Sequence, residues 1–271
     1  MHLRLRRNRG FSLRRRGVKA RRTDNHHGCR FLSPRDRRDH SKVACSFCCS
    51  SNLEFGRDTT TTRAYMAVRF TSQEISRMYD GFARWYDWAE AIPEVLGVSK
   101  LRRTLLRRAS GSVLEVAVGT GKNLNFYPES CSITAADLSR QMLNVARSRA
   151  GNLSAHVSLL LTNAEALPFD SKSFDTVVST LSTCTFPNPV AALREMRRVC
   201  RTDGKILLLE HGRSQRESIG RWQDRHEDSF AKRLGCHWNR EPLELASQAN
   251  LRVVVARHTF FGIFHVIEAK P

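Results

Sequence analysis

The sequence predicts an α/β fold, in which helices cover a doubly wound sheet of seven strands that is mostly parallel. The first observation behind this prediction is that strand-like runs rich in Val, Leu and Ile alternate with amphipathic helical segments. The second is the short connection between the last two runs, which predicts that the final strand pairs antiparallel. The third is the length of 271 residues, which suits one such domain and an appendage.

Two helices are expected before the alternation begins. Apolar residues recur at helical spacing through 72–96, and Thr71 and Ser72 stand where a helix is capped. Pro93 should bend or break this helix. A second amphipathic helix is expected at 99–109.

The alternating part gives the remaining elements. Ser139 is the expected N-cap of one helix, and a proline begins the next. We expect strands at 112–118, 132–137, 156–161, 174–182, 205–210, 251–260 and 262–270, and helices at 139–150, 188–200 and 242–249.

Basic residues concentrate in the first quarter of the chain. Residues 1–70 hold 18 Lys and Arg against 5 Asp and Glu, whereas residues 71–271 hold 27 against 21. The first 23 residues contain no acid, which is typical of an organelle transit peptide. We therefore divide the chain into a basic transit peptide or disordered arm at 1–66 and a folded domain at 67–271.

This division carries a prediction about location. The Arg-rich start favours the mitochondrion, and the Ser and Cys content further on leaves a plastid as the alternative. A disordered arm that binds nucleic acid or lipid is another interpretation of the same segment. A true start at Met66 would make the protein cytoplasmic.

Eight cysteines are present, half of them before residue 50. C-x-x-C spacing can place two thiolates on one zinc ion, but the second half-site lacks paired spacing, so no metal site is predicted. The ligands weighed for it are His26, His27, Cys29, Cys45 and Cys48. The cysteines at 131, 184, 200 and 236 lie in apolar contexts and are expected to be reduced, buried thiols.

A Gly-x-Gly turn, Gly119 to Gly121, follows the strand expected at 112–118. A P-loop would need Ser or Thr after Lys122, and a dinucleotide fingerprint would need glycine at Leu124. The remaining candidate ligand is S-adenosylmethionine, which has no phosphates and needs an acid at the end of the second strand. Asp137 stands there and can accept hydrogen bonds from a ribose diol, although the same acid would serve NAD.

Glu115 interrupts the apolar run of the first strand, where a carboxylate is costly to bury without donors. We assign it to ordering the loop's N–H groups and binding the amino group of the ligand. The alternative is a buried acid satisfied by a neighbouring loop.

Several strings resemble the class I S-adenosylmethionine-dependent methyltransferases of the ubiquinone/menaquinone-biosynthesis type, type 11. "NAEALPF" with "SFD" at 163–175 and "LREMRRVCRTDGKILLLEHGRS" at 193–214 resemble two of its blocks. "VLEVAVGTG" resembles its first motif, with Ala117 in place of a common glycine. The segments 210–245 and 260–271 resemble a mitochondrial and methyltransferase-like 7 branch. The resemblance spans 70–271 and implies a Rossmann-like single domain.

The resemblance also implies positions for the cofactor. Adenine should lie against Leu138 and Ala164, with its amine near Asn163, usually Asp in the family, or Glu165. Tyr79 on the helix before the domain should touch the sulfonium, with an ordinary core role as the alternative. The expected cofactor-binding residues are Tyr79, Glu115, Ala117, Gly119, Thr120, Gly121, Asn123, Asp137, Leu138, Met142, Asn163, Ala164, Glu165, Thr180 and Leu181.

His211 follows the fifth strand and is the candidate general base, with loop ordering as the alternative role. The insertion 213–241, which holds His226, Asp228 and His237, is the expected lid over the acceptor. Cys184 is a candidate for substrate contact, or an inert thiol.

Methyltransferases that act on nucleic-acid amines carry a second proline and an aromatic residue that "STCTFPNPV" at 182–190 lacks, so no nucleic-acid partner is predicted. The apolar lid and "FFGIF" at 260–264 favour a small lipophilic acceptor (a thiol, a quinone-like ring or a lipid) and peripheral membrane association. The alternative is a non-catalytic S-adenosylmethionine-binding assembly factor for an organelle membrane complex.

Overall fold

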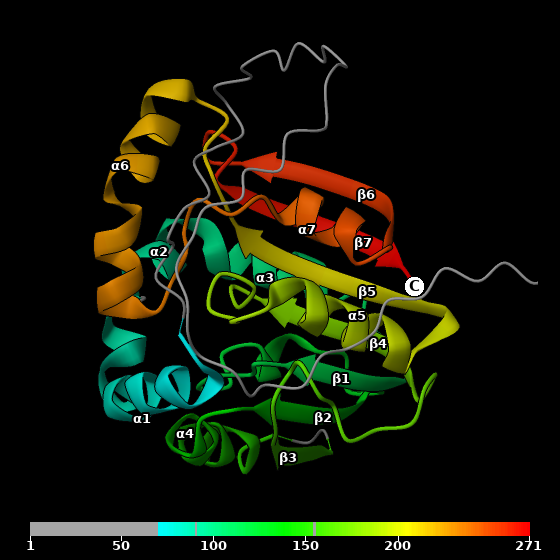
Figure 1. The fold of residues 1–271 in the computed structure, drawn as a ribbon. Helices are drawn as coiled ribbons and strands as arrows, with labels where there is room; N and C mark the ends of the chain where they lie inside the picture. Colours follow the sequence, from blue (N-terminus) through cyan, green and yellow to red (C-terminus); the bar gives the residue numbers. More distant parts are fainter. Residues whose placement is uncertain (1–69, 90, 154–155) are drawn as a thin grey trace, which may run out of the picture. The chain divides into compact units, whose positions relative to one another are not determined.

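The computed structural model describes residues 70–89, 91–153 and 156–271. Its centre is a seven-stranded sheet of order β3-β2-β1-β4-β5-β7-β6 (Figure 1). The strands β1 to β5 pair in parallel, and β7 runs antiparallel to both β5 and β6. The predicted fold class is confirmed. The strands are β1 (Ser112–Val116), β2 (Ser132–Asp137), β3 (Val157–Leu161), β4 (Phe174–Thr180), β5 (Cys200–His211), β6 (Arg252–Thr259) and β7 (Phe264–Lys270).

The predicted helices are present with shifts at their ends, and the insertion expected to form the lid contains an additional long helix, α6, that was not predicted. The helix expected over 72–96 stops as α1 at Ala89, before Pro93, and the chain continues through the short turns α2 and η1, where Gly97 has a φ of 132°. Ser139 caps α4 as predicted, its Oγ accepting the N–H of Met142 at 3.1 Å. The helices are α1 (Ser72–Ala89), α2 (Ala91–Pro93), η1 (Glu94–Val98), α3 (Ser99–Leu106), η2 (Leu124–Phe126), α4 (Arg140–Ala150), α5 (Pro189–Val199), α6 (Glu217–Leu234) and α7 (Pro242–Gln248).

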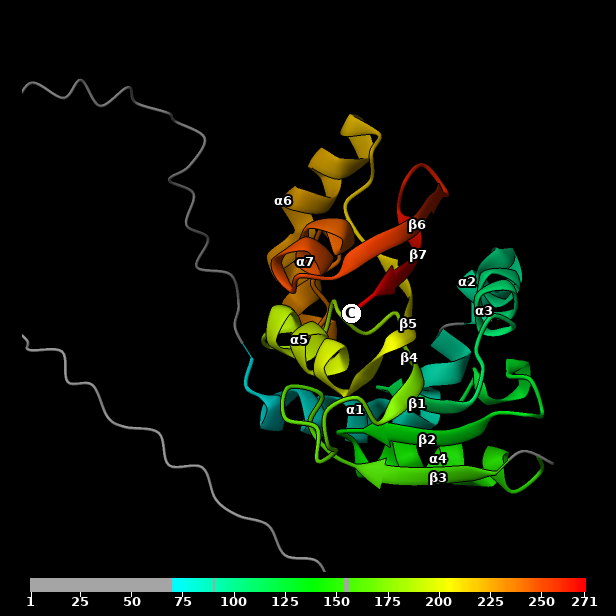
Figure 2. The ribbon, with the colours of Figure 1, turned by 90° about the vertical axis from the view of Figure 1, so that its right-hand side faces the viewer.

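Two hydrophobic cores lie on the two faces of the sheet. Alternate residues of β1 enter different cores: Leu114 and Val116 pack with α5 and α7, and Val113 packs with α3 and α4. Figure 2 shows α5 and α7 on one side of the sheet and α3 on the other. The central strands β1 and β4 are therefore buried on both faces along almost their whole length.

The carboxyl ends of the parallel strands meet at one edge of the sheet, where α1 and α6 lie (Figure 1). Strand order reverses between β1 and β4, and ligands of open α/β sheets bind at such a point. Two hydrogen bonds tie α1 to the loop after β2: Ser76 Oγ donates to Leu138 O at 3.1 Å, and Ser139 Oγ donates to Asp80 Oδ1 at 2.6 Å. Within the described residues, no helix is both long and apolar enough to cross a membrane.

Candidate functional site

The loop after β1 adopts left-handed backbone angles at three positions. Ala117, Gly119 and Gly121 have φ values of 56°, 57° and 82°. A Cβ at Gly119 would meet no atom within 4 Å, so this glycine keeps space open. A Cβ at Gly121 would lie 2.9 Å from Leu124 Cδ1 and 3.2 Å from Ala146 Cα, so this glycine allows close packing on α4. The two glycines thus have different physical roles.

Asp137 ends β2 and joins that loop to the start of α4. Its Oδ2 accepts the N–H of Gly119 at 2.8 Å, and its Oδ1 accepts the N–H of Ser139 at 2.8 Å. Burial raises the pKa of the carboxyl to about 6, against the lowering effect of these donors. Each oxygen keeps a second lone pair for a ligand donor.

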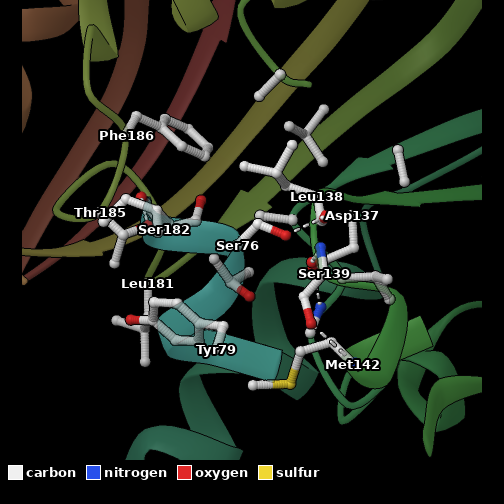
Figure 3. A pocket seen from close by; sticks show the side chains of 18 of the residues that line it. Ser76, Tyr79, Asp137, Leu138, Ser139, Met142, Leu181, Ser182, Thr185 and Phe186 are labelled. Atoms are coloured by element: carbon white, nitrogen blue, oxygen red, sulfur yellow. Dashed lines mark hydrogen bonds between the residues drawn. The ribbon is translucent and has the colours of Figure 1, made fainter. Parts of the chain in front are cut away.

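A pocket opens above this acid, with about 920 Å³ of space including its solvent mouth. Its wall comes from α1, the β1 loop and the ends of β2, β3 and β4 (Figure 3). A concave wall of apolar side chains with a few convergent polar groups is typical of a small-molecule site. The expected cofactor residues that line it are Tyr79, Ala117, Gly119, Thr120, Asp137, Leu138, Met142, Asn163, Ala164, Thr180 and Leu181.

Four expected cofactor residues lie off the pocket wall, among them Glu115. This buried acid accepts hydrogen bonds from Asn123 Nδ2 at 2.7 Å and from the Tyr127 hydroxyl at 2.9 Å. Burial raises its pKa to about 7. The arrangement corresponds to the alternative interpretation, in which a neighbouring loop satisfies the acid. Its partner Asn123 lies behind the wall with it.

The other two such residues are held by packing and capping. Gly121 faces α4, as described above. Glu165 turns away and accepts the N–H of Asn188 at 2.7 Å, which fixes the start of α5.

The sequence analysis missed Arg102 of α3, which is buried and lines the pocket. Its Nε pairs with Glu94 Oε1 at 2.8 Å, and its guanidinium donates to Thr180 Oγ1 at 2.6 Å. The sequence pattern could have indicated its burial, because Leu105 and Leu106 lie three and four residues later and are buried on the same face of the helix. Arg102 brings positive charge to the end of the pocket nearest β4.

The helix α1 forms one side of the pocket through Ser76, Tyr79 and Tyr86. Thr120 Oγ1 donates to Asp87 Oδ1 at 2.7 Å, which fastens the end of this helix to the glycine turn. The hydroxyl of Tyr79 donates to Leu234 O at 3.3 Å, at the end of α6. The helix before the domain is therefore part of the site.

His211 does not line the pocket; its Nε2 lies 3.4 Å from Cys236 Sγ. The thiol of Cys184 hydrogen-bonds Cys236, and this bond together with His211 holds the pKa of Cys236 well below its usual range. Of the lid residues, His226 contacts Trp222 O through Nδ1 at 2.8 Å. Asp228 is exposed on the same helix, and His237 is hydrogen-bonded through Nδ1 to a glutamate of α6.

Comparison with known proteins agrees with this geometry. Residues 114–208 match the family described as "Methyltransferase domain". The chain is 31% identical over 192 residues to the ubiquinone/menaquinone biosynthesis C-methyltransferase UbiE of Hahella chejuensis, covering 66% of this chain and 76% of that protein. It is 32% identical over 142 residues to a phosphatidylethanolamine N-methyltransferase of Cereibacter sphaeroides, covering 51% of this chain and 70% of that one.

A longer match is to "Methyltransferase OMS1, mitochondrial" of Saccharomyces cerevisiae. The two are 28% identical over 219 residues, which is 73% of this chain, while the chain spans only 46% of that protein. Among solved structures, the fold is similar to a possible histamine N-methyltransferase of Thermotoga maritima, with a TM-score of 0.56 and 20% identity over 72% of this chain and 98% of that one. The chain therefore belongs to the class I S-adenosylmethionine-dependent methyltransferases, and S-adenosylmethionine is its cofactor.

Proposed function

We propose that the described domain transfers a methyl group from S-adenosylmethionine to a small, lipophilic acceptor. The observation that carries this proposal is the Asp137 carboxylate, held beneath the pocket by the N–H groups of Gly119 and Ser139. Its unused lone pairs suit the two hydroxyl donors of a ribose. When bound, the cofactor supplies an electrophilic methyl group on a sulfonium, and a neutral thioether remains after transfer.

The rest of the wall would serve the two ends of this cofactor. The side chains of Leu138, Met142 and Ala164 offer an apolar surface to adenine. Asn163 Oδ1 already accepts the N–H of Glu165 at 3.0 Å, and its second lone pair suits the adenine amine.

Arg102 suits the carboxylate of the methionine end, because a buried guanidinium binds carboxylates strongly. The hydrogen bond from Arg102 to Thr180 fixes the guanidinium at the end of β4, next to the point between β1 and β4 where the strand order reverses. The chain's own contribution to the reaction is then alignment of the acceptor with the methyl group and exclusion of water by α1.

A lipophilic acceptor is favoured by exposed apolar side chains on α1, the helix that forms one side of the pocket, and on the turns that follow it. Trp88 and Val95 are 80% and 87% exposed, which is unusual for large apolar side chains. We name the exposed set Trp85, Trp88, Ile92, Val95 and Leu96 the apolar patch. Exposed basic residues flank it at Arg84 and Lys100, so the patch fits an anionic lipid surface. Two of the relatives are named for phosphatidylethanolamine and for ubiquinone/menaquinone, which agrees with an acceptor of this class.

The mitochondrion is the compartment that we propose, because the relative with the longest overlap described above is named as mitochondrial. The transit peptide expected at 1–66 lies outside the described residues. Imaging of the full chain, tagged at its C-terminus, against mitochondrial and plastid markers tests this proposal. Signal at the plastid or spread through the cytoplasm would contradict it.

The test of function uses the full chain with methyl-labelled S-adenosylmethionine and cell extract separated into lipid, thiol, RNA and protein fractions. We expect label in the lipid or thiol fraction, with steady formation of S-adenosylhomocysteine. The Asp137→Ala variant should lose this transfer, and the Asp170→Ala variant, which removes an exposed acid away from the pocket, should keep it. Label only in RNA or protein would refute the acceptor class. Tight binding without turnover, combined with full cellular function of Asp137→Ala, would instead support the assembly factor.

A further inference from the structure

Three side chains with metal-binding atoms converge behind the loop that follows β4. Cys184 lies in that loop, His211 ends β5, and Cys236 follows α6. One ligand atom from each lies within 4.8 Å of the other two, and His211 Nε2 is 3.4 Å from Cys236 Sγ. The three residues are 25 or more positions apart in sequence, so the tertiary fold alone brings them together.

The loop carrying Cys184 is held from two elements of the fold. Buried Glu210, next to His211, accepts the N–H groups of Ser182 at 3.0 Å and Thr183 at 3.1 Å. On the side of Cys236, the N–H of His237 donates to Cys184 O at 2.9 Å. Glu210, the neighbour of His211, and His237, the neighbour of Cys236, thus both hydrogen-bond the loop that carries Cys184. These bonds position the Cys184 thiol before any metal ion binds.

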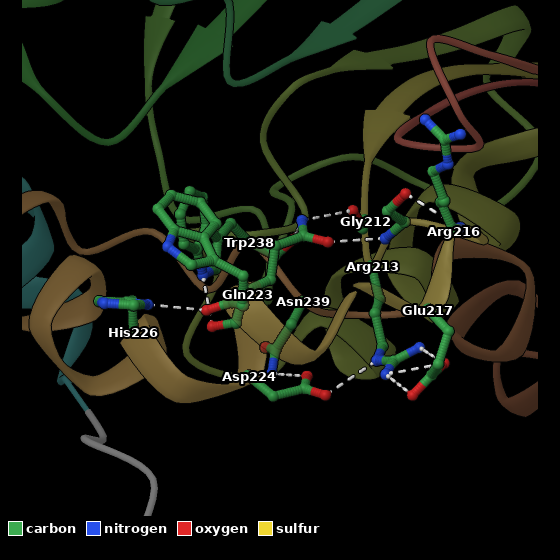
Figure 4. Close-up of polar contacts among 11 residues, drawn as sticks. Gly212, Arg213, Arg216, Glu217, Gln223, Asp224, His226, Trp238 and Asn239 are labelled. Carbon is green, nitrogen blue, oxygen red and sulfur yellow. Dashed lines mark hydrogen bonds and ion pairs between the residues drawn. The ribbon is translucent and has the colours of Figure 1, made fainter. Parts of the chain in front are cut away.

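The segment carrying Cys236 is fixed in a similar way by Gln223 of α6 (Figure 4). This buried amide donates to Gly212 O at 3.1 Å and to Trp238 O at 3.2 Å, and it accepts the N–H of Ser214 at 2.7 Å. Gly212 follows His211, and Trp238 lies two residues after Cys236. One side chain therefore sets the spacing between the two ligand-bearing segments.

The donor set is that of a zinc site. Two thiols and one imidazole are the ligands that Zn²⁺ prefers, with bonds of about 2.3 Å to sulfur and about 2.0–2.1 Å to nitrogen. In a tetrahedron with such bonds, a sulfur and a nitrogen lie about 3.5 Å apart. The distance of 3.4 Å between Cys236 Sγ and His211 Nε2 is close to this value.

Glu227 of α6 provides a second, independent observation. It is 5% exposed, and its Oε1 lies 2.6 Å from Nδ1 of His237, the residue next to Cys236. Its Oε2 is buried and has no hydrogen-bond partner among the described residues. A buried carboxylate oxygen calls for a donor, and a water bound to a metal ion in this cluster would be one.

We propose that Cys184, His211 and Cys236 bind one zinc ion, which ties the segment after α6 to the ends of β4 and β5. Three protein ligands leave a fourth tetrahedral position for a water molecule or another small ligand. Cys184 stands between Ser182 and Thr185, both of which line the cofactor pocket, so the ion borders that pocket without belonging to it. The site goes beyond the proposed methyl transfer and is tested separately from it.

The experiment measures metal binding to the full chain. To remove other thiol ligands, Cys29, Cys45, Cys48 and Cys49 are replaced by serine in the protein that serves as background. Titration of the reduced, metal-free protein with Co²⁺ should give one bound ion per chain, with thiolate charge-transfer absorption and the intense visible bands of a tetrahedral site. Zn²⁺ should displace the Co²⁺ and raise the melting temperature, because it binds the folded state.

Matched variants decide which thiols are responsible. Cys184→Ser, Cys236→Ser and His211→Gln should each abolish the visible bands and the zinc-dependent rise in melting temperature. Cys131→Ser, which alters another buried thiol outside the cluster, should keep both. Far-ultraviolet circular dichroism and binding of S-adenosylhomocysteine show whether each variant is folded.

Three results would overturn the proposal. The background protein fails to bind Co²⁺ or Zn²⁺; the folded Cys184→Ser and Cys236→Ser variants bind as tightly as the background; or mass mapping of protein kept in reducing buffer finds a Cys184–Cys236 disulfide in place of the metal. None of these results bears on methyl transfer, so the two proposals fail independently.

Discussion

Replacing Gly121 by alanine should destabilise the fold, because a side chain there meets packed atoms in a strained backbone. At a φ of 82°, any L-residue other than glycine costs about 1–2 kcal/mol. The new methyl group would stand 2.9 Å from Leu124 Cδ1 and 3.2 Å from Ala146 Cα, and overpacking of this kind costs about 1–3 kcal/mol. The sum is a loss of about 2–5 kcal/mol in the free energy of unfolding.

Gly119→Ala is the matched variant, since it adds the same methyl group two residues away. At the φ of 57° of residue 119, an alanine costs about 1–2 kcal/mol of backbone strain, as it does at residue 121. However, no atom lies within 4 Å of the new Cβ, so no overpacking is added. The methyl group enters the open space of the pocket that Gly119 lines, so the main loss should be in cofactor affinity. We expect at least a tenfold rise in the Kd for S-adenosylhomocysteine, about 1.4 kcal/mol.

Urea unfolding without cofactor and calorimetric titration with S-adenosylhomocysteine separate the two effects. Gly121→Ala should have the lower urea midpoint with an unchanged m-value, and Gly119→Ala the higher Kd. Equal destabilisation by the two substitutions would refute the packing argument at α4. An unchanged Kd for Gly119→Ala would refute the placement of the cofactor over the turn.

Four further predictions concern single side chains. Because burial raises the pKa of Asp137 to about 6 and only the carboxylate accepts both ribose donors, the Kd for S-adenosylhomocysteine should rise as pH falls below 6, and this dependence should be absent in Asp137→Asn. Glu115 has an ordinary pKa of 4.5 and a folded pKa of about 7, so the folded state holds a proton between these values; as pH rises through that window, Glu115 should lower the free energy of unfolding measured in urea by about 3 kcal/mol, and Glu115→Gln should reduce the total fall by this amount while keeping the part due to Asp137. Arg102→Gln should weaken calorimetric binding of S-adenosylhomocysteine more than that of methylthioadenosine, which lacks the amino-acid carboxylate; equal losses would contradict the proposed role. Ala117→Gly should raise the urea midpoint by the equivalent of about 0.5–1 kcal/mol, because glycine adopts the φ of 56° without strain but loses more entropy on folding.

The sheet was predictable because its sequence features are local. Most strands of the parallel region contain a short run of Val, Leu or Ile, and the antiparallel end follows from one short connection between β6 and β7. The start of β5 was not predictable in this way, because the strand begins at Cys200, five residues before the expected residue 205. Cys200 pairs with Phe174 across a bulge, and such a pairing depends on the neighbouring strand.

The residues of the candidate site also divide into those that could be predicted from local sequence and those that depend on tertiary packing. Asp137 could be placed because an acid at the end of a strand must stand at the edge where the strands of a parallel sheet converge. The role of Arg102 could not be predicted, because α3 carries two adjacent arginines, Arg102 and Arg103, and only tertiary packing decides which of them is buried. The position of Glu115 on β1 was predictable, but its hydrogen-bond partners were not. Asn123 and Tyr127 contact it only because the chain after β1 folds back over the strand.

The cluster of Cys184, His211 and Cys236 could not be predicted from strand order alone. β4 and β5 are neighbours in the sheet, so Cys184, which follows β4, and His211, which ends β5, must lie close together at its carboxyl edge. Cys236 joins them only because α6 returns the chain to that edge, and α6 is a largely charged helix whose path is set by the buried amide of Gln223. Motif spacing cannot reveal a donor set that is assembled across so long an insertion. It can reveal the glycine turn and its acid, because both lie within the short segment from β1 to the end of β2.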